Sequence, residues 1–162
     1  MKTSNTAFEW GHLFSTRMLA VLFLGFSSGL PLFVMLYLMQ AWLAKGGVDV
    51  KQLGLFALVG FPYTFKFLWA PFMDRYSLGP LGRRRGWMAL TQLALFLIIG
   101  AIGTLDPRTQ LSLIVLAAGA MTFVSASQDI VIDAYRREIL EDAEQGLGAA
   151  VSVNAYKAAG LV

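Results

Sequence analysis

Residues 18–44 read MLAVLFLGFSSGLPLFVMLYLMQAWLA, a run of 27 residues without a single charged side chain. About 20 apolar residues, each rising ~1.5 Å, are enough to cross the ~30 Å hydrocarbon core of a bilayer. A secretory signal peptide has an apolar region of only about 7–15 residues, followed by a small-residue cleavage site, and no such site follows this run. The stretch therefore predicts a retained transmembrane helix.

Four more hydrophobic runs follow the first one. Together they predict helices at about 18–44, 53–73, 87–105, 111–135 and 147–162, the last of which stops after about 16 residues and is truncated. Apolar residues make up 57% of the chain and charged residues 14%, against about 45–50% and ~25% in ordinary globular domains. We therefore predict an all-α, polytopic helical membrane protein, with residues 18–162 in the bilayer and residues 1–17 as an interfacial segment.

The distribution of basic residues predicts the orientation of these helices. Eight of the 13 lysines and arginines fall before the first span, in the loop between spans two and three, or after span four, whereas three fall in the other connections. The positive-inside rule then places the N-terminus and both basic loops in the cytoplasm. Basicity here sets the topology and does not indicate a nucleic-acid partner. The only histidine, His12, is expected at the headgroups.

Enzyme chemistry has little support in the sequence. The chain has no cysteine, so thiolate catalysis and cysteine metal sites are excluded. It also lacks the glycine-rich phosphate loop, the H-E-x-x-H helix and the G-x-S-x-G elbow. We expect no enzyme activity, no metal site and no cofactor.

A more specific local signal lies between the second and third runs. An acid–base pair, Asp74 and Arg75, is followed by Gly82 and three consecutive arginines, Arg83, Arg84 and Arg85. This pattern resembles the characteristic cytoplasmic loop motif of the major facilitator superfamily. We interpret the motif as a gate. Asp74 would face the positively polarised N-terminus of a partner helix, and the arginines would pair with acids on neighbouring helices. The alternative is a basic loop that only sets topology.

Several further segments are similar to the AmpG muropeptide permeases. They are 24–32 (LGFSSGLPL), 66–71 (KFLWAP), 74–76 (DRY), 82–87 (GRRRGW), 125–131 (SASQDIV), 133–134 (DA) and 148–153 (GAAVSV). The resemblance implies a proton-coupled importer that carries anhydro-muropeptides, sugar-peptide fragments of peptidoglycan, across the bacterial inner membrane. Members of that family have a dozen or more helices, so the resemblance covers an N-terminal portion, and the remainder of the transporter is an expected partner.

Charges inside the predicted spans are candidate site residues, because each costs at least ~2.5–3.5 kcal/mol to bury. Lys66 and Asp129 both lie about 9–10 Å from the cytoplasmic surface and are predicted to pair, with a snorkelling Lys66 as the alternative. Lys157 lies ~15 Å deep, near the midplane, and is predicted to line a cavity. Asp133 and Arg137 are predicted to form a surface helix pair.

Small and amide residues complete the candidate pathway. Gly25 and Gly29 form a small-xxx-small step that serves either helix packing or a ligand passage. Pro31 and Pro62 favour kinks. Gln128, like Gln92, is a polar candidate that serves equally well as an interhelical hydrogen-bonding group.

The sequence as a whole predicts the N-terminal portion of a permease that moves a sugar-peptide and protons across a lipid bilayer. Two alternatives stay open at this point. One is a truncated, non-transporting membrane protein or subunit, and the other is a major facilitator permease for a different solute.

Overall fold

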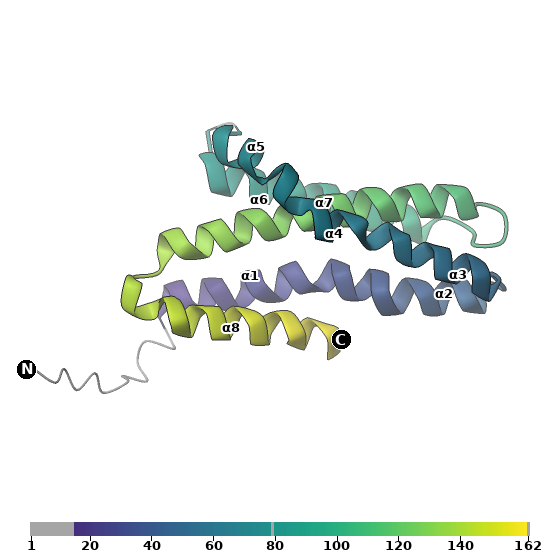
Figure 1. Cartoon of the computed structure of the whole chain (residues 1–162), viewed down its shortest axis with the longest axis horizontal. Helices are drawn as coiled ribbons and strands as arrows, with labels where there is room; N and C mark the ends of the chain where they lie inside the picture. Colours follow the sequence, from purple (N-terminus) through teal and green to yellow (C-terminus); the bar gives the residue numbers. More distant parts are fainter. Residues whose placement is uncertain (1–14, 79, 162) are drawn as a thin grey trace, which may run out of the picture.

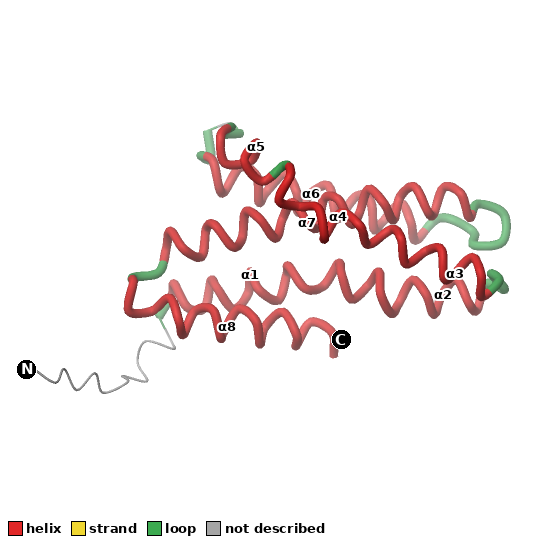
Figure 2. Tube along the Cα trace, viewed as in Figure 1, coloured by secondary structure: helices red, strands yellow, loops and turns green. Residues whose placement is uncertain are grey.

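The computed structural model describes residues 15–78 and 80–161, and every regular element within these residues is helical (Figures 1 and 2). The predicted interfacial segment, including His12, lies outside the described residues apart from its last three positions. The elements, in chain order, are α1 (Thr16–Phe33), a π-helical segment (Val34–Met39), α2 (Gln40–Lys45), α3 (Val50–Phe56), a 3-10 turn (Ala57–Gly60), α4 (Phe61–Phe65), a second 3-10 turn (Lys66–Leu68), α5 (Ala70–Arg75), α6 (Arg83–Gly103), α7 (Leu111–Ile139), a third 3-10 turn (Asp142–Glu144), α8 (Gln145–Ala158) and a last 3-10 turn (Ala159–Leu161).

The first apolar run, residues 18–44, lies in one continuous helix of 30 residues, Thr16–Lys45. This helix consists of α1, the π-helical segment and α2, and we refer to it as the rod. The rod begins where the Ser15 hydroxyl accepts a hydrogen bond from the Met18 backbone N–H at 3.2 Å, which satisfies one of the free donors of the first turn. The widened π turns follow Pro31, whose ring removes one backbone donor from the ladder. The predicted irregularity near Pro31 is therefore a local widening within a continuous rod.

The second predicted helix, residues 53–73, is not one helix. The chain between Val50 and Arg75 is divided into α3, α4 and α5 by two 3-10 turns. Pro62 and Pro71 stand at the starts of α4 and α5, where a missing backbone donor is tolerated. Three continuous helices in the described part of the chain are long and apolar enough to cross a membrane: Thr16–Lys45, Arg83–Gly103 and Leu111–Ile139.

α7 is the central helix of the bundle. It contacts α1, α6 and the broken α3–α5 segment, while α8 packs along α1 (Figure 1). Because the connections are short, the chain reverses direction at each one: the Thr16–Lys45 helix and α6 run one way, while the α3–α5 segment and α7 run the other way. α7 ends at Ile139, four residues beyond the predicted end, and α6 begins at Arg83, four residues before the predicted start, so both helices extend past their apolar runs into the basic ends.

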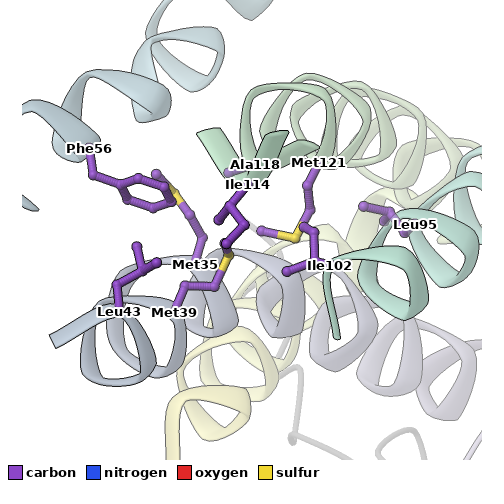
Figure 3. Packing of buried hydrophobic residues seen from close by; sticks show 9 residues of the cluster. All are labelled: Met35, Met39, Leu43, Phe56, Leu95, Ile102, Ile114, Ala118 and Met121. Atoms are coloured by element: carbon purple, nitrogen blue, oxygen red, sulfur yellow. The ribbon is translucent and has the colours of Figure 1, made fainter. Parts of the chain in front are cut away.

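The largest buried cluster joins the rod, α3, α6 and α7 (Figure 3). Its members are Met35, Met39, Leu43, Phe56, Leu95, Ile102, Ile114, Ala118 and Met121. Large apolar side chains also cover the outside, where Phe96 is 75% exposed and Leu116 is 71% exposed. An apolar exterior around a helical bundle is what a lipid environment requires, so packing and composition agree on a multi-pass membrane protein.

Candidate functional site

Buried polar side chains gather on the C-terminal half of α7. Ser125, Ser127, Gln128 and Asp129 are all less than 10% exposed, and Thr122 lies one turn earlier. They are buried because α7 is covered by neighbouring helices on several sides. A polar group in such surroundings is costly unless it is paired, so each partner is informative.

Asp129 is the centre of this cluster. Its Oδ2 lies 3.5 Å from the Lys66 Nζ, and its Oδ1 accepts a hydrogen bond from the Ser28 hydroxyl. The Lys66 side chain is 34% exposed and the Asp129 side chain is 11% exposed. The predicted contact between these two charges is therefore present, and it joins α7 to both α1 and the broken segment.

Two further contacts tie the broken segment to α7. The hydroxyls of Tyr63 and Ser125 lie 2.5 Å apart, and the Trp69 indole N–H donates to the Ser127 hydroxyl at 3.0 Å. Neither Ser28 nor Tyr63 nor any other hydroxyl of this cluster was predicted as a site residue from the sequence. Each of them falls in an apolar run, and nothing in the sequence separates such a hydroxyl from one that serves ordinary helix packing.

The two glycines of α1 lie against α8. A Cβ atom on Gly25 would stand 2.7 Å from the carbonyl oxygen of Ser152, and one on Gly29 would stand 2.5 Å from the carbonyl oxygen of Tyr156. These approaches leave no room for a side chain. The structure therefore accounts for both glycines by close helix packing, the first of the two alternatives.

Lys157 does not join the Asp129 cluster. It lies on the exposed face of α8, and it makes no ion pair with any residue that the structure describes. Its neighbours one turn earlier, Val153 and Asn154, are exposed as well, whereas Ala155 and Ala159 face the bundle. A lysine near the predicted midplane on this face is available to a group outside the described chain, and its role in lining a cavity stays a prediction.

The loop motif between α5 and α6 forms a connected set of ion pairs. The Arg84 Nη1 lies 2.5 Å from the Asp74 Oδ1, and its Nε donates to the Glu138 Oε1 at 2.8 Å. Arg83 donates to the backbone carbonyl of Asp74 at 2.9 Å and lies 3.7 Å from the same Glu138 oxygen. Asp74 therefore faces the N-terminus of α6, as the sequence predicts, and the arginines pair with an acid on a neighbouring helix.

The remaining residues of the motif have other surroundings. Gly82 adopts a φ of +82°, which favours glycine, immediately before α6. The Arg75 guanidinium lies 5.9 Å from the centre of the Tyr76 ring, and Arg85 is exposed. The predicted pair of Asp133 with Arg137 is wrong, because Asp133 pairs with Arg136 at 3.5 Å; a spacing of three also places two side chains on one helix face.

The two glutamines differ in their contacts. The Gln92 Nε2 donates to the Ser27 hydroxyl at 3.3 Å and so makes a bond between α6 and α1. Gln128 is 1% exposed, and neither atom of its amide has a hydrogen-bond partner among the described residues. The described residues also contain no group of three or more acidic or histidine side chains arranged to hold a metal ion.

Comparisons with known proteins agree with the membrane architecture. A family model described as "Acetyl-coenzyme A transporter 1" matches residues 17–111. The chain is 48% identical to an uncharacterized protein of Haemophilus influenzae over 93% of the chain and 35% of that protein. It is also 48% identical to the anhydromuropeptide permease of Escherichia coli K12 over 90% of the chain and 30% of the permease.

A more distant relative is also named as a transporter. It is the putative transporter AmpG 1 of Rickettsia felis, which is 31% identical over 88% of this chain and 33% of its own length. The chain thus spans about one third of the length of the curated relatives it matches. The resemblance to the AmpG permeases is confirmed, and it concerns their N-terminal portion. Because these relatives are named as permeases or transporters, they support the prediction that the chain is not an enzyme.

Proposed function

Since the chain belongs to the transporter family described as acetyl-coenzyme A transporter 1, we propose that it forms the N-terminal part of a major facilitator permease that imports anhydro-muropeptides. The observation that supports this cargo is the 48% identity to the anhydromuropeptide permease over 90% of the chain. The permease would lie in the bacterial inner membrane with its N-terminus in the cytoplasm, as the distribution of basic residues favours.

Protons are the proposed driving ions, and Asp129 is the proposed carrier. When Asp129 is ionised, Lys66 and Ser28 hold it, and the broken segment and α1 are tied to α7. A proton on Asp129 removes the attraction to Lys66 and weakens both ties at once. Protonation would therefore favour a different arrangement of these helices, which is what coupling of a proton to alternating access requires.

The cytoplasmic ion pairs are the proposed gate. Arg84 holds Asp74 at the end of α5 and Glu138 near the end of α7, so three helices are joined at one point. Asp74 and Glu138 are about half exposed, while the Arg84 side chain is 12% exposed. Water reaches both carboxylates and screens the two pairs, which suits a contact that forms and breaks during each transport cycle.

Lys157 is the proposed substrate contact. Its ammonium is unpaired within the described chain and lies near the predicted midplane, where transporters bind their cargo. A muropeptide carries carboxylates, and an ammonium in a low-dielectric cavity attracts them strongly. Both features support an electrostatic role in cargo binding.

A chimera tests this role. The chain replaces the aligned 146-residue N-terminal part of the E. coli permease, and uptake of an anhydro-muropeptide is measured in proteoliposomes. Lys157→Met is expected to lower uptake at least about tenfold, which corresponds to a loss of ~1.4 kcal/mol of binding free energy. Lys157→Arg keeps the positive charge and is expected to retain part of the uptake. Lys51→Met, which removes an exposed lysine of α3, is the matched control. Unchanged uptake in Lys157→Met would remove Lys157 from the site.

A second candidate cargo comes from the name of the matched family. The description of the family model that matches residues 17–111 names acetyl-coenzyme A, which is a different anionic solute. Competition in the same chimera separates the two, because unlabelled muropeptide, and not acetyl-coenzyme A, is expected to inhibit uptake. The third possibility is a membrane protein that does not transport, and uptake by the chimera would contradict it. The 162-residue chain alone is expected to transport nothing in either case.

A further inference from the structure

The two members of the Lys66–Asp129 ion pair differ in how much surface they present. The Asp129 side chain is 11% exposed, and both of its oxygens have partners, the Ser28 hydroxyl at Oδ1 and the Lys66 ammonium at Oδ2. The Lys66 side chain is 34% exposed. The pair therefore consists of an enclosed carboxylate and an ammonium that reaches the surface of the bundle.

The Lys66 ammonium has N–H donors that the pair does not use. An ammonium carries three such donors, and in the described part of the chain its only polar partner is the Asp129 Oδ2, at 3.5 Å. That separation is longer than the ~2.7–2.9 Å of a strong bond between an ammonium and a carboxylate. The contact with Asp129 therefore leaves Lys66 able to hold a second anion on its exposed side.

A second carboxylate at Lys66 would change the balance of charge around Asp129. The titratable groups that face Asp129 are Lys66, Asp133 one turn later on α7, Tyr63 of α4 and Tyr156 of α8. A tyrosine hydroxyl is neutral near pH 7, and Asp133 has an arginine partner of its own. Lys66 is thus the only positive charge among these groups. When two carboxylates share one ammonium in a low dielectric, the excess negative charge favours a proton on one of them.

We propose that Lys66 binds a carboxylate of the anionic cargo, and that this binding draws one proton from water onto Asp129. The proposal rests on the proposed function and adds to it a second ammonium besides Lys157 and a link between cargo and proton. Protonation of Asp129 cancels the one net negative charge of the three groups, so that the cargo carboxylate no longer shares Lys66. The link is reciprocal, because a proton on Asp129 must strengthen cargo binding by the same factor by which cargo strengthens proton binding.

The affinity for cargo as a function of pH tests this link in the chimera with the E. coli permease. The Kd of an anhydro-muropeptide is measured in detergent between about pH 6 and 8, where free carboxylates stay ionised. If one proton is taken up with each cargo molecule, Kd is expected to fall by up to about tenfold for each unit by which the pH is lowered. A Kd that does not change with pH would overturn the proposal and leave the proposed cargo in place, whereas the absence of any binding would overturn both.

Two single variants are expected to change the affinity in opposite directions. Asp129→Asn keeps the shape of a protonated Asp129, so the chimera is expected to bind cargo at least as tightly as before and to lose the dependence on pH. Lys66→Met removes the ammonium and is expected to raise Kd at least about tenfold. Lys66→Arg keeps the charge and is expected to retain part of the affinity. If the pair only held the helices together, Asp129→Asn and Lys66→Met would weaken binding alike, and that outcome would overturn the proposal.

Asp142→Asn and Lys51→Met are the matched controls, because both side chains are exposed. Each control is expected to keep the affinity and the pH dependence of the unmodified chimera. Should a single variant fail to fold, the double variant Lys66→Met with Asp129→Asn takes its place, since it leaves neither charge without a partner. The double variant is expected to bind cargo weakly and independently of pH. Unchanged affinity in the double variant would contradict the role of Lys66, and an unchanged pH dependence would contradict the role of Asp129.

Discussion

At the scale of residues, the Lys66–Asp129 contact is the feature with the sharpest consequence. Removing one partner leaves the other charge uncompensated in low dielectric, which costs several kcal/mol, while removing both costs less. Lys66→Met and Asp129→Asn are each expected to lower the yield of folded protein in detergent. The double variant is expected to be no worse than either single one. Additive losses would mean that Lys66 snorkels toward the surface and contributes independently of Asp129.

The same pair shows what sequence can predict about a site. The predicted depth of the two residues in the membrane was enough to predict the contact. Both lie at similar distances from the C-terminal ends of two predicted helices that run in the same direction. Depth did not predict the hydroxyl of Ser28, since a serine in an apolar run is common and its rotation about the helix axis is not visible in sequence. The unpaired amide of Gln128 was equally hidden, because its burial depends on how α6 and α1 close over α7.

At the scale of elements, the contact between α1 and α8 depends on glycine at two positions. Gly29→Ala places a methyl 2.5 Å from the Tyr156 carbonyl oxygen, so the helices must separate. We expect a destabilisation of about 1–3 kcal/mol, seen as a lower Tm of the 162-residue chain in detergent. Gly119→Ala on α7 is the matched control. A Cβ atom there would meet no neighbouring helix within 4 Å in the described part of the chain, so this change is expected to be neutral or stabilising. Equal losses in both variants would contradict close packing at Gly29.

Element boundaries were predicted with uneven success, for identifiable reasons. The first run, residues 18–44, differs from the observed rod by two residues at one end and one at the other, because hydropathy sets the length of a membrane helix. The run at 53–73 was predicted as a single helix, and the structure divides it. Pro62 and Pro71 marked the breaks, but the 3-10 turns also depend on contacts with α7, such as the bond from the Thr122 hydroxyl to the Val59 carbonyl.

At the scale of the whole molecule, orientation follows from charge, and it is directly measurable. The chain has no cysteine, so one introduced cysteine is the only reactive thiol. Asp49 and Arg108 lie in exposed connections on one side of the bundle, and Ser77 lies in the basic connection on the other side. These positions suit labelling better than Gly46, where a Cβ atom would meet Pro107 at 2.7 Å.

With the N-terminus in the cytoplasm, Asp49→Cys and Arg108→Cys are expected to react with an impermeant thiol reagent in intact cells. Ser77→Cys is expected to react only after the cells are opened. The reverse labelling pattern would mean that the molecule has the opposite orientation in the membrane. It would place the Asp74–Arg84–Glu138 contacts on the outer surface and move the Lys66–Asp129 pair to the outer half of the membrane. The measurement therefore decides on which side of the membrane the proposed gate and the proposed proton carrier lie.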